Sequence, residues 1–466
     1  MLTYSFEEKG SDSLYEFLYK QIKSDILNYK LSPDEKLPSK RALAKHLNVS
    51  TVTVENAYLQ LMAEGYIYSV AKSGYYVSHL STTKAGSVRM PVHTAPASNN
   101  STCSYFADFV NNSTASNNFP FTTWTKLMRE TMSDEADKLM VNSPSTGVPA
   151  LRTAIADYLF QFRGMAVEPE QIVIGAGTEY LYNLIIQLLD RNKTYAVEDP
   201  GYQKITKIYQ ANKVSCIPVP LDMNGIDVEY LESVNADVLH ISPSHHFPTG
   251  IVTPISRRYE LLSWASKAPE RYIIEDDYDS EFRLLGKPIP SLQSIDVLDK
   301  VIYMNTFSKT LASTIRISYM VLPKGLMDRY KQELSFYSCT VSNFEQYTLA
   351  HFIERGHFEK HINRMRNFYR SRRDAVIGCI KKHPLYNKVT IREENAGLHF
   401  LLTVDTQYSD EELLERARNH GINISCLSKY FSDYTKSTEH TLIINYSGIE
   451  KERIEKAVEL LFESIS

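Results

Sequence analysis

A lysine and an arginine seven residues apart are the first side chains of this 466-residue sequence that could carry chemistry. Lys309 follows the apolar run VIYMN within the segment TFSK, and Arg316 lies in the segment TIRIS. A lysine at the end of a strand is usually a surface residue, but the neighbours of Lys309 are mostly uncharged. An amine in such surroundings can attack a carbonyl group, and a guanidinium can bind a phosphate.

Three other segments place polar or aromatic groups directly after apolar runs. Residues 175–179 (GAGTE) open a helix whose free N–H groups could bind a phosphate. Tyr202 follows TYAVE, and Asp276 and Tyr278 end a very apolar run. Each signal is weak alone, because glycine turns are common and a tyrosine there is more often a packing residue. Acids at the edge of a sheet, however, are costly to bury unless they meet a cation.

Taken together, these groups suit pyridoxal 5'-phosphate, an aldehyde cofactor with a cationic ring nitrogen, a phenolic oxygen and a phosphate. Lys309 would form a Schiff base with the aldehyde, and Asp276 would pair with the ring nitrogen. Tyr278 would hydrogen-bond the ring hydroxyl oxygen, and Tyr202 would stack on the ring face. The phosphate end of the site would comprise Gly177, Thr178, Glu179, Thr306, Ser308 and Arg316.

These groups must be positioned by strands that end at one edge of a sheet. The apolar runs QIVIG, TYAVE, VLHI, RYIIED, VIYMN and ISYMVLP alternate with helical segments within residues 105–466. Such runs, spaced by helices, indicate an α/β fold with a mainly parallel sheet. In these sheets, ligands bind at the carboxyl ends of the strands.

Residues 1–80 show a different, helical pattern. Apolar residues recur every four positions from Leu14 to Ile26, and a short second helix follows Pro38. Ser50 is a good N-cap for a third helix, after which YIYSV and YYV flank a turn as a β-hairpin. This is the pattern of a winged helix-turn-helix. Residues 81–104 are small and polar, which predicts a flexible linker.

The charges of this N-terminal segment are balanced, but residues 36–54 contain no acid. Lys36, Lys40 and Arg41 in that run would lie against DNA phosphates, and the third helix would present Thr51 and Thr53 to base edges. The alternative is a small three-helix domain without DNA, since many such domains carry a few lysines.

The string EKLPSKRALAKHLNVSTVTVENAYLQLMAEGYIY resembles the winged-helix head of the GntR family of bacterial regulators. The resemblance implies contacts with operator DNA from the two helices and the wing, through Ser39, Arg41, Ser50, Thr51, Thr53 and Gly74. We expect Lys72, in the turn of the wing, to contact DNA as well. Many members have arginine where this chain has Thr51 and Glu55, so its operator should differ from theirs.

The larger segment resembles the MocR subfamily of GntR regulators, in which the winged helix is fused to a fold-type I aminotransferase-like domain. The similar motifs are PSHHFPTG, EDDYDSEFR and NTFSKTLASTIRISYMVLP. The resemblance assigns Lys309, Asp276, Tyr278, Tyr202 and Arg316 the same roles. It also implies a head-to-tail homodimer, each winged helix lying over the large domain of the other chain.

Two departures bear on the effector. GabR-like members bind a carboxylate with arginines. The arginine expected two residues after the stacking tyrosine is Lys204 here, and the C-terminal segment HTLIINYS, where another is expected, contains no arginine. A bidentate carboxylate clamp is therefore missing at both places. The enzymes' Asn-Pro-Thr-Gly is Phe247-Pro248-Thr249-Gly250 here. His246 either replaces the lost amide near the ring hydroxyl or is a packed imidazole.

The composition excludes several other classes of protein. No stretch approaches a membrane span, and the acidic N-terminus does not resemble a secretory signal. Five scattered cysteines without a CxxC pair predict neither a disulfide framework nor a metal site. A cytoplasmic location fits best.

We therefore expect a bacterial transcription regulator that binds operator DNA and pyridoxal 5'-phosphate. Two effectors compete: an amino compound that displaces Lys309, or the cofactor itself, as in PdxR-type members that control vitamin B6 synthesis. The missing arginines favour the cofactor. The alternative is an active aminotransferase with an accessory N-terminal domain. A basic segment at residues 355–373 would be either a solvated helix face or a track for bent DNA.

Overall fold

The computed structural model describes residues 2–6, 10–80, 105–111, 118–284, 289–395, 397–433 and 439–466. The chain divides into two compact units, Met1–Ser101 and Thr102–Ser466, which are considered separately below. The segment at residues 81–104, for which a flexible linker is predicted, lies outside the described residues.

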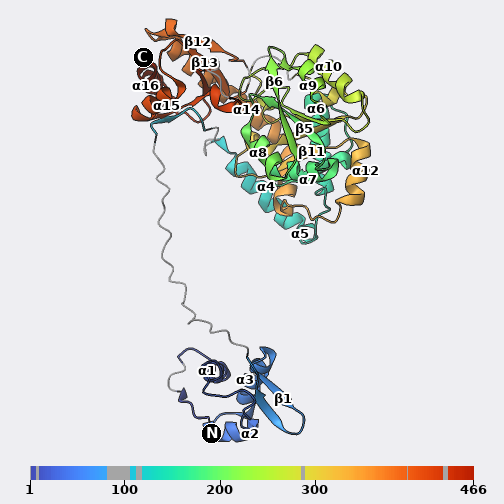
Figure 1. The fold of residues 1–466 in the computed structure, drawn as a ribbon, viewed down its shortest axis with the longest axis vertical. Coiled ribbons are helices and arrows are strands. Elements are labelled where there is room, and N and C mark those ends of the chain that lie inside the picture. Colours follow the sequence, from blue (N-terminus) through green and yellow to red (C-terminus); the bar gives the residue numbers. More distant parts are fainter. Residues whose placement is uncertain are drawn as a thin grey trace. The chain divides into compact units, whose positions relative to one another are not determined.

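The N-terminal unit contains three helices and a hairpin, as expected (Figure 1). They are α1 (Leu14–Leu27), α2 (Lys40–Leu47), α3 (Thr51–Ala63), β1 (Ile67–Val70) and β2 (Gly74–Val77). Ser39 caps α2 by accepting the Ala42 N–H at 3.2 Å, and Ser50 caps α3 by accepting the Thr53 N–H at 3.0 Å. A left-handed residue, Asn48, ends α2 and turns the chain between the two helices. The winged helix-turn-helix is confirmed.

The C-terminal unit is built on an eight-stranded sheet, in the order β4-β11-β10-β9-β8-β5-β6-β7. In chain order the strands are β4 (Ile172–Gly175), β5 (Thr194–Asp199), β6 (Ser215–Asp222), β7 (Gly225–Ile226), β8 (Val238–Ile241), β9 (Tyr272–Asp276), β10 (Val301–Thr306) and β11 (Ser318–Val321). The five strands from β10 to β6 pair in parallel, and β11 is antiparallel to both neighbours. The mainly parallel sheet is confirmed.

Helices cover both faces of this sheet and bury alternate residues of its strands. Tyr303 of β10 packs in the core under α6 and α13, whereas Ile302 and Met304 pack under α7 and α12. The helices of this part are α4 (Phe121–Asp134), α5 (Ala136–Leu139), α6 (Pro149–Arg163), α7 (Thr178–Leu189), α8 (Gln203–Ala211), α9 (Val228–Ser233), α10 (Ile255–Ser266), α11 (Phe307–Thr310), α12 (Lys324–Glu333) and α13 (Asn343–Glu354).

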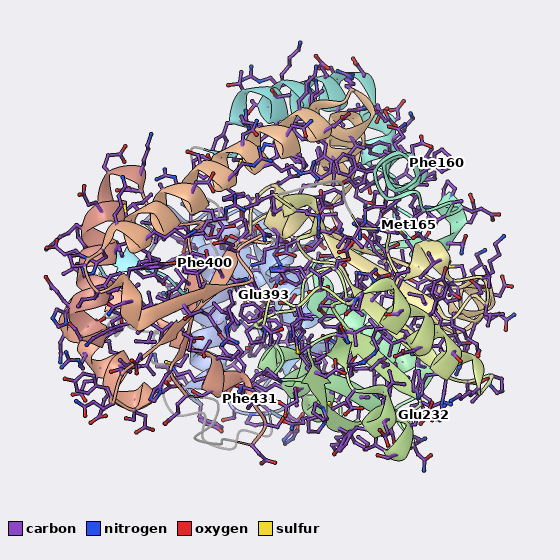
Figure 2. The ribbon with its side chains drawn as sticks, turned by 90° about the horizontal axis from the view of Figure 1, so that it is seen from above. Phe160, Met165, Glu232, Glu393, Phe400 and Phe431 are labelled. Atoms are coloured by element: carbon purple, nitrogen blue, oxygen red, sulfur yellow. The ribbon has the colours of Figure 1, made fainter. Side chains whose placement is uncertain are left out.

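A smaller C-terminal part lies beside the large sheet (Figure 1). Its four-stranded sheet has the order β12 (Val389–Arg392), β13 (His399–Val404), β16 (Thr441–Asn445) and β15 (Ser425–Cys426), with α15 (Asp410–Asn419) and α16 (Ile454–Ile465). Figure 2 labels Phe400 of β13, whose side chain is fully buried in this part. The long helix α14 (His357–Lys382) packs on the same core, and β14 (Ile422–Asn423) pairs with β3 (Ala107–Asp108).

Candidate cofactor site and DNA-binding surface

The lysine and the aspartate of the predicted site lie at the carboxyl ends of neighbouring strands. Asp276 is the last residue of β9 and pairs in register with Met304 of β10, and Lys309 follows in α11. Thr306 starts this turn by accepting the Ser308 N–H at 3.2 Å. The parallel pairing thus brings Lys309 and Asp276 to one edge of the sheet, as the sequence predicts.

The partial burial of Lys309 favours its unprotonated amine, which is the nucleophilic form. Desolvation lowers the pKa of Lys309, and the positive charge of Lys204 lowers it further, while Asp279 raises it. Desolvation is the largest of these effects. A larger fraction of this amine is therefore unprotonated near neutral pH than of an exposed lysine.

Asp276 has one oxygen occupied and one buried oxygen without a partner among the described residues. Tyr182 donates to Oδ2 at 2.5 Å, and His240 Nε2 lies 3.7 Å from the same oxygen, whereas Oδ1 has no hydrogen bond there. A buried acceptor of this kind is costly unless a donor reaches it. The N–H of a pyridinium ring is such a donor, so this carboxylate fits the ring nitrogen of pyridoxal phosphate.

The phosphate end is formed by the turn before α7 and by Arg316. Gly177 has a φ of 93°, and a Cβ there would lie 2.3 Å from Arg316 Nη2, so only glycine fits. Arg316 Nη2 lies 2.5 Å from Glu179 Oε2, and Lys204 pairs with the other oxygen of Glu179. One carboxylate therefore holds both cations. Thr178, the first residue of α7, follows Gly177 directly.

The hydroxyls of Thr306 and Ser308 bond to the loop after α11 and to the start of β11. Ser308 donates to the Ile315 carbonyl at 2.8 Å, and Ser318 donates to Thr306 Oγ1 at 2.8 Å. These bonds shape the loop that carries Arg316. Their contact with a phosphate stays a prediction.

The aromatic side of the site includes two residues that the sequence did not single out as ligand contacts. Tyr202 is 48% exposed. Its ring packs edge-to-face with that of Phe247, with the ring centroids 5.9 Å apart. Phe247 also contacts Tyr430, 5.2 Å away, whose carbonyl accepts the Gly201 N–H at 3.0 Å. Tyr430 is distant in sequence and belongs to the C-terminal part, so no local signal could have found it.

His246 is buried beside the acid Glu198 rather than exposed. Its Nδ1 lies 2.7 Å from Thr249 Oγ1, and its Nε2 lies 3.4 Å from Glu198 Oε2. Burial lowers the pKa of His246 to about 3 and raises that of Glu198 to about 8, so both groups are neutral at pH 7. The role of His246 near the ring hydroxyl stays a prediction.

Each of the other acids in the segment EDDYD (residues 275–279) has a hydrogen-bond or ion-pair partner, which offsets the free-energy cost of its burial. Asp277 forms an ion pair with Arg163 at 2.6 Å and accepts from Tyr303 at 2.7 Å. Glu275 accepts the N–H groups of Leu292 and Gln293. Asp277 Oδ1 is also buried without a hydrogen-bond partner among the described residues, but Asp277 is already paired with a cation, so Asp276 is the better candidate for the ligand acid. Tyr182, which orients Asp276, was missed by the sequence analysis, although it lies one helical turn after Thr178 on α7.

The predicted DNA contacts of the N-terminal unit lie mostly on its surface. Arg41, Thr51 and the wing residue Lys72 are exposed, and Lys36 is exposed beside the ring of Tyr76. Ser39 and Ser50 are occupied as N-caps, and Gly74 begins β2 with a φ of 130°. Lys40 forms an ion pair with Glu55, and the Thr53 hydroxyl lies 2.8 Å from Ser50 Oγ; the DNA contacts of both residues stay predictions.

The basic helix α14 is tied to the protein rather than free. Its arginines Arg366, Arg370 and Arg373 donate to the backbone carbonyls of Glu281, Leu284 and Glu394. Arg355, just before the helix, pairs with Glu130 at 2.5 Å. These bonds give three of the arginines a structural role, whereas Lys360 and Arg364 are exposed, so the choice between a solvated face and a DNA track for residues 355–373 stays a prediction.

No group of three or more His, Cys, Asp or Glu side chains among the described residues could hold a metal ion. Over the same residues, no helix is long and apolar enough to cross a membrane.

Comparisons with known proteins match both units. Residues 110–461 match the class I and II aminotransferase family, and residues 14–77 match the gntR family of bacterial regulatory proteins. The HTH-type transcriptional regulator YdeL of Bacillus subtilis is 38% identical over 448 residues, 96% of each chain. The probable rhizopine catabolism regulatory protein MocR of Rhizobium meliloti is 30% identical over 96% of this chain and 93% of its own.

The chain belongs to the MocR subfamily of GntR transcription regulators. Another relative of this MocR-type chain is the pyridoxine biosynthesis transcriptional regulator PdxR of Corynebacterium glutamicum, 30% identical over 89% of this chain and 88% of its own. The solved structure of Pyrococcus horikoshii kynurenine aminotransferase with PMP is 25% identical, with a TM-score of 0.67, over 78% of this chain and 91% of that chain. The large unit of this MocR-type regulator thus has the fold-type I aminotransferase architecture.

Proposed function

We propose that this regulator binds operator DNA through residues 36–74 and pyridoxal 5'-phosphate through Lys309, and that the state of the cofactor site sets its DNA affinity. The observation that carries the cofactor site is the buried Oδ1 of Asp276, which has no hydrogen-bond partner in the part of the chain that the structure describes, one strand away from the partly buried Lys309. The head and the site lie in one chain, so a change at the site can bias the head by linkage.

The bound cofactor supplies an electrophilic aldehyde carbon and a positively charged ring. Lys309 provides the attacking amine, which burial keeps partly unprotonated. Asp276, held by Tyr182, accepts the ring N–H, and Arg316 with the N–H groups after Gly177 binds the phosphate. Tyr202 covers one face of the ring, and Tyr278 donates to the ring oxygen.

The cofactor itself is the effector that the site favours over a carboxylate-bearing amine. The cation expected to bind a carboxylate, Lys204, is already paired with Glu179. In addition, β16 is an apolar strand, TLIIN, with no arginine. A carboxylate would compete with Glu179 for Lys204, as a phosphate would for Arg316, but only the phosphate finds a guanidinium group there.

An active aminotransferase is the second candidate, because the large unit has the fold of the kynurenine aminotransferase and the lysine, aspartate and tyrosines stand at its sheet edge. Steady conversion of an amino acid and a 2-oxo acid would support the enzyme. Specific operator binding without turnover supports the regulator.

The deciding experiment is footprinting of the purified full-length protein on its own upstream DNA, with and without pyridoxal phosphate. We expect a protected region whose half-saturation concentration changes with the cofactor. An identical footprint at identical concentrations would contradict the sensor role. Sedimentation of the same samples tests the proposed head-to-tail homodimer, which should sediment at twice the chain mass of 53.3 kDa. We propose that this regulator acts in the cytoplasm.

A further inference from the structure

A buried histidine, His245, bridges the cofactor residue Tyr278 and the acid Asp279. Its Nδ1 lies 2.9 Å from Asp279 Oδ2 and 3.2 Å from the Tyr278 hydroxyl oxygen. The side chains of His245 and Asp279 are each only 3% exposed. This triad lies in two of the segments that the sequence analysis singled out, PSHHFPTG and EDDYD. Asp279 has so far entered only through its charge near Lys309, and His245 has no role in the site described above.

The contact with Asp279 decides which nitrogen of His245 carries the hydrogen. An unprotonated Nδ1 would set its lone pair against a carboxylate oxygen at 2.9 Å, which is repulsive. Nδ1 must therefore carry a hydrogen and donate it, and a carboxylate partner fixes this tautomer.

The same N–H decides where the hydroxyl hydrogen of Tyr278 points. The single N–H of Nδ1 is shared between Asp279 Oδ2 and the more distant Tyr278 oxygen, which can only accept from it, so the Tyr278 hydrogen cannot bond to Nδ1. That hydrogen is left for another acceptor. A phenol that accepts one hydrogen bond also becomes a stronger donor of the next.

The ring of His245 is held in place by the C-terminal part. His399 of β13 packs on it with ring centroids 4.9 Å apart. A Cβ at Gly397, which has a φ of 68°, would lie 1.8 Å from Cε1 of His245, so only glycine fits there. The Nε2 atom has no hydrogen-bond partner among the described residues, but the ring lines a cavity of about 10 Å³, roughly the space that one water needs.

We propose that His245 is a positioning residue, locked by Asp279, which turns the Tyr278 hydroxyl hydrogen toward the ring oxygen of the bound cofactor. This inference rests on the proposed cofactor site. It adds a residue of the PSHHFPTG loop to the control of the cofactor's electronic state, and it links that state to the C-terminal part through His399 and Gly397.

The test is the midpoint pH of the visible absorption band of the cofactor-loaded, full-length protein. A donor to the ring oxygen favours the form that carries more negative charge there, so losing the donor raises the midpoint. We expect Tyr278→Phe to raise it by about 1 unit and His245→Gln by about half as much. The amide of Gln reaches the Nε2 position, whereas the amide of Asn reaches the Nδ1 position, so His245→Asn should stay near the wild-type midpoint.

Two controls separate positioning from a general structural effect. His420→Gln makes the same exchange at a histidine of the C-terminal part whose Nδ1 lies 2.8 Å from the Arg416 carbonyl, and it should leave the midpoint unchanged. In the Tyr278→Phe background, His245→Gln should cause no further shift, because the hydrogen that it orients is gone.

The proposal is overturned if Tyr278→Phe leaves the midpoint unchanged, if His245→Gln shifts the midpoint equally with and without Tyr278, or if Asn and Gln at position 245 behave alike. A wild-type protein without a visible band, or with a band that survives Lys309→Ala, would instead contradict the cofactor site itself. The two failures are therefore distinguishable.

Discussion

The single amine of Lys309 should account for all covalent attachment of the cofactor. Lys309→Ala should abolish the adduct that borohydride traps, because no other lysine lies at the end of β10 beside Asp276. Mass spectrometry of the reduced protein measures the adduct. The control is Lys204→Ala, which changes a nearby exposed cation and should retain the adduct. A normal adduct in Lys309→Ala would show that the site is assigned wrongly.

The pH dependence of attachment follows from the burial of Lys309. Only the unprotonated amine attacks, and burial lowers its pKa, so the rate should rise with pH and level off earlier than for an exposed lysine. Stopped-flow absorbance of the apo-protein mixed with pyridoxal phosphate gives this profile, with Nα-acetyl-lysine as the reference amine. Coincident profiles would mean that the amine is exposed when it reacts.

The carboxylate of Glu179 should weaken the binding of carboxylate-bearing amines. Glu179→Gln removes the partner of Lys204, and we expect the affinity of γ-aminobutyrate to rise about fivefold, since a partly exposed ion pair contributes up to about 1 kcal/mol. Spectral titration of the loaded protein measures this affinity, and the gain should shrink at high salt. The matched control is Glu168→Gln, whose partner Lys324 lies away from the site. Equal gains in both variants would count against a local effect.

At the scale of elements, the two helices of the head should contribute differently to DNA binding. Arg41 is exposed on α2, so Arg41→Ala should weaken binding to all DNA and reduce the salt slope by about 1, as expected for one lost phosphate contact. Thr53→Ala on α3 should alter the preferred site more than the overall affinity. Fluorescence anisotropy at several salt concentrations measures both effects. Lys30→Ala, an exposed cation after α1, is the control. An unchanged salt slope in Arg41→Ala would show that α2 does not face the phosphates.

The packing of the helices also explains why the sequence did not predict which positive charges are exposed. The sequence of α14 predicts a basic surface. Three of its arginines, however, donate to carbonyl groups outside the helix. A guanidinium has five donors, and carbonyl groups of irregular loops need donors when they are buried. The number of cations in a helix therefore does not predict a free positive surface.

At the scale of the whole molecule, cofactor loading and amino acids should act unequally on operator affinity. A carboxylate held by one lysine loses about tenfold to a hundredfold in affinity relative to one held bidentately by arginine. Simple amino acids should therefore change the cofactor spectrum only at millimolar concentration, whereas pyridoxal phosphate should bind the apo-protein tightly and change operator affinity. Titration of the apo- and the loaded protein with both ligands, followed by absorbance and anisotropy, measures this. A micromolar amino acid that shifts both signals, while loading shifts neither, would reverse the assignment.

Local order along the chain was enough to predict the two units and their element types, and it singled out the residues proposed to bind the cofactor. The strands with apolar runs were predicted because alternation and helix spacing are local properties. By contrast, β6 was not predicted: Pro218 and Pro220 argue against a strand, although an outer strand tolerates them. The order of strands was likewise beyond the sequence, since β11 enters the sheet antiparallel between β4 and β10.

The sequence by itself determined which side chains could do the chemistry, because residue type and position after a strand are written in it. Only the tertiary structure decided their partners. It assigned Arg163 to Asp277, which leaves Asp276 for the ligand, and it paired Glu179 with both Lys204 and Arg316. It also brought Tyr430 and His399 of the C-terminal part to the site loop. The physical reason is that hydrogen bonds and ion pairs act over a few ångströms, and segments a hundred or more residues apart reach that distance only after the chain has packed.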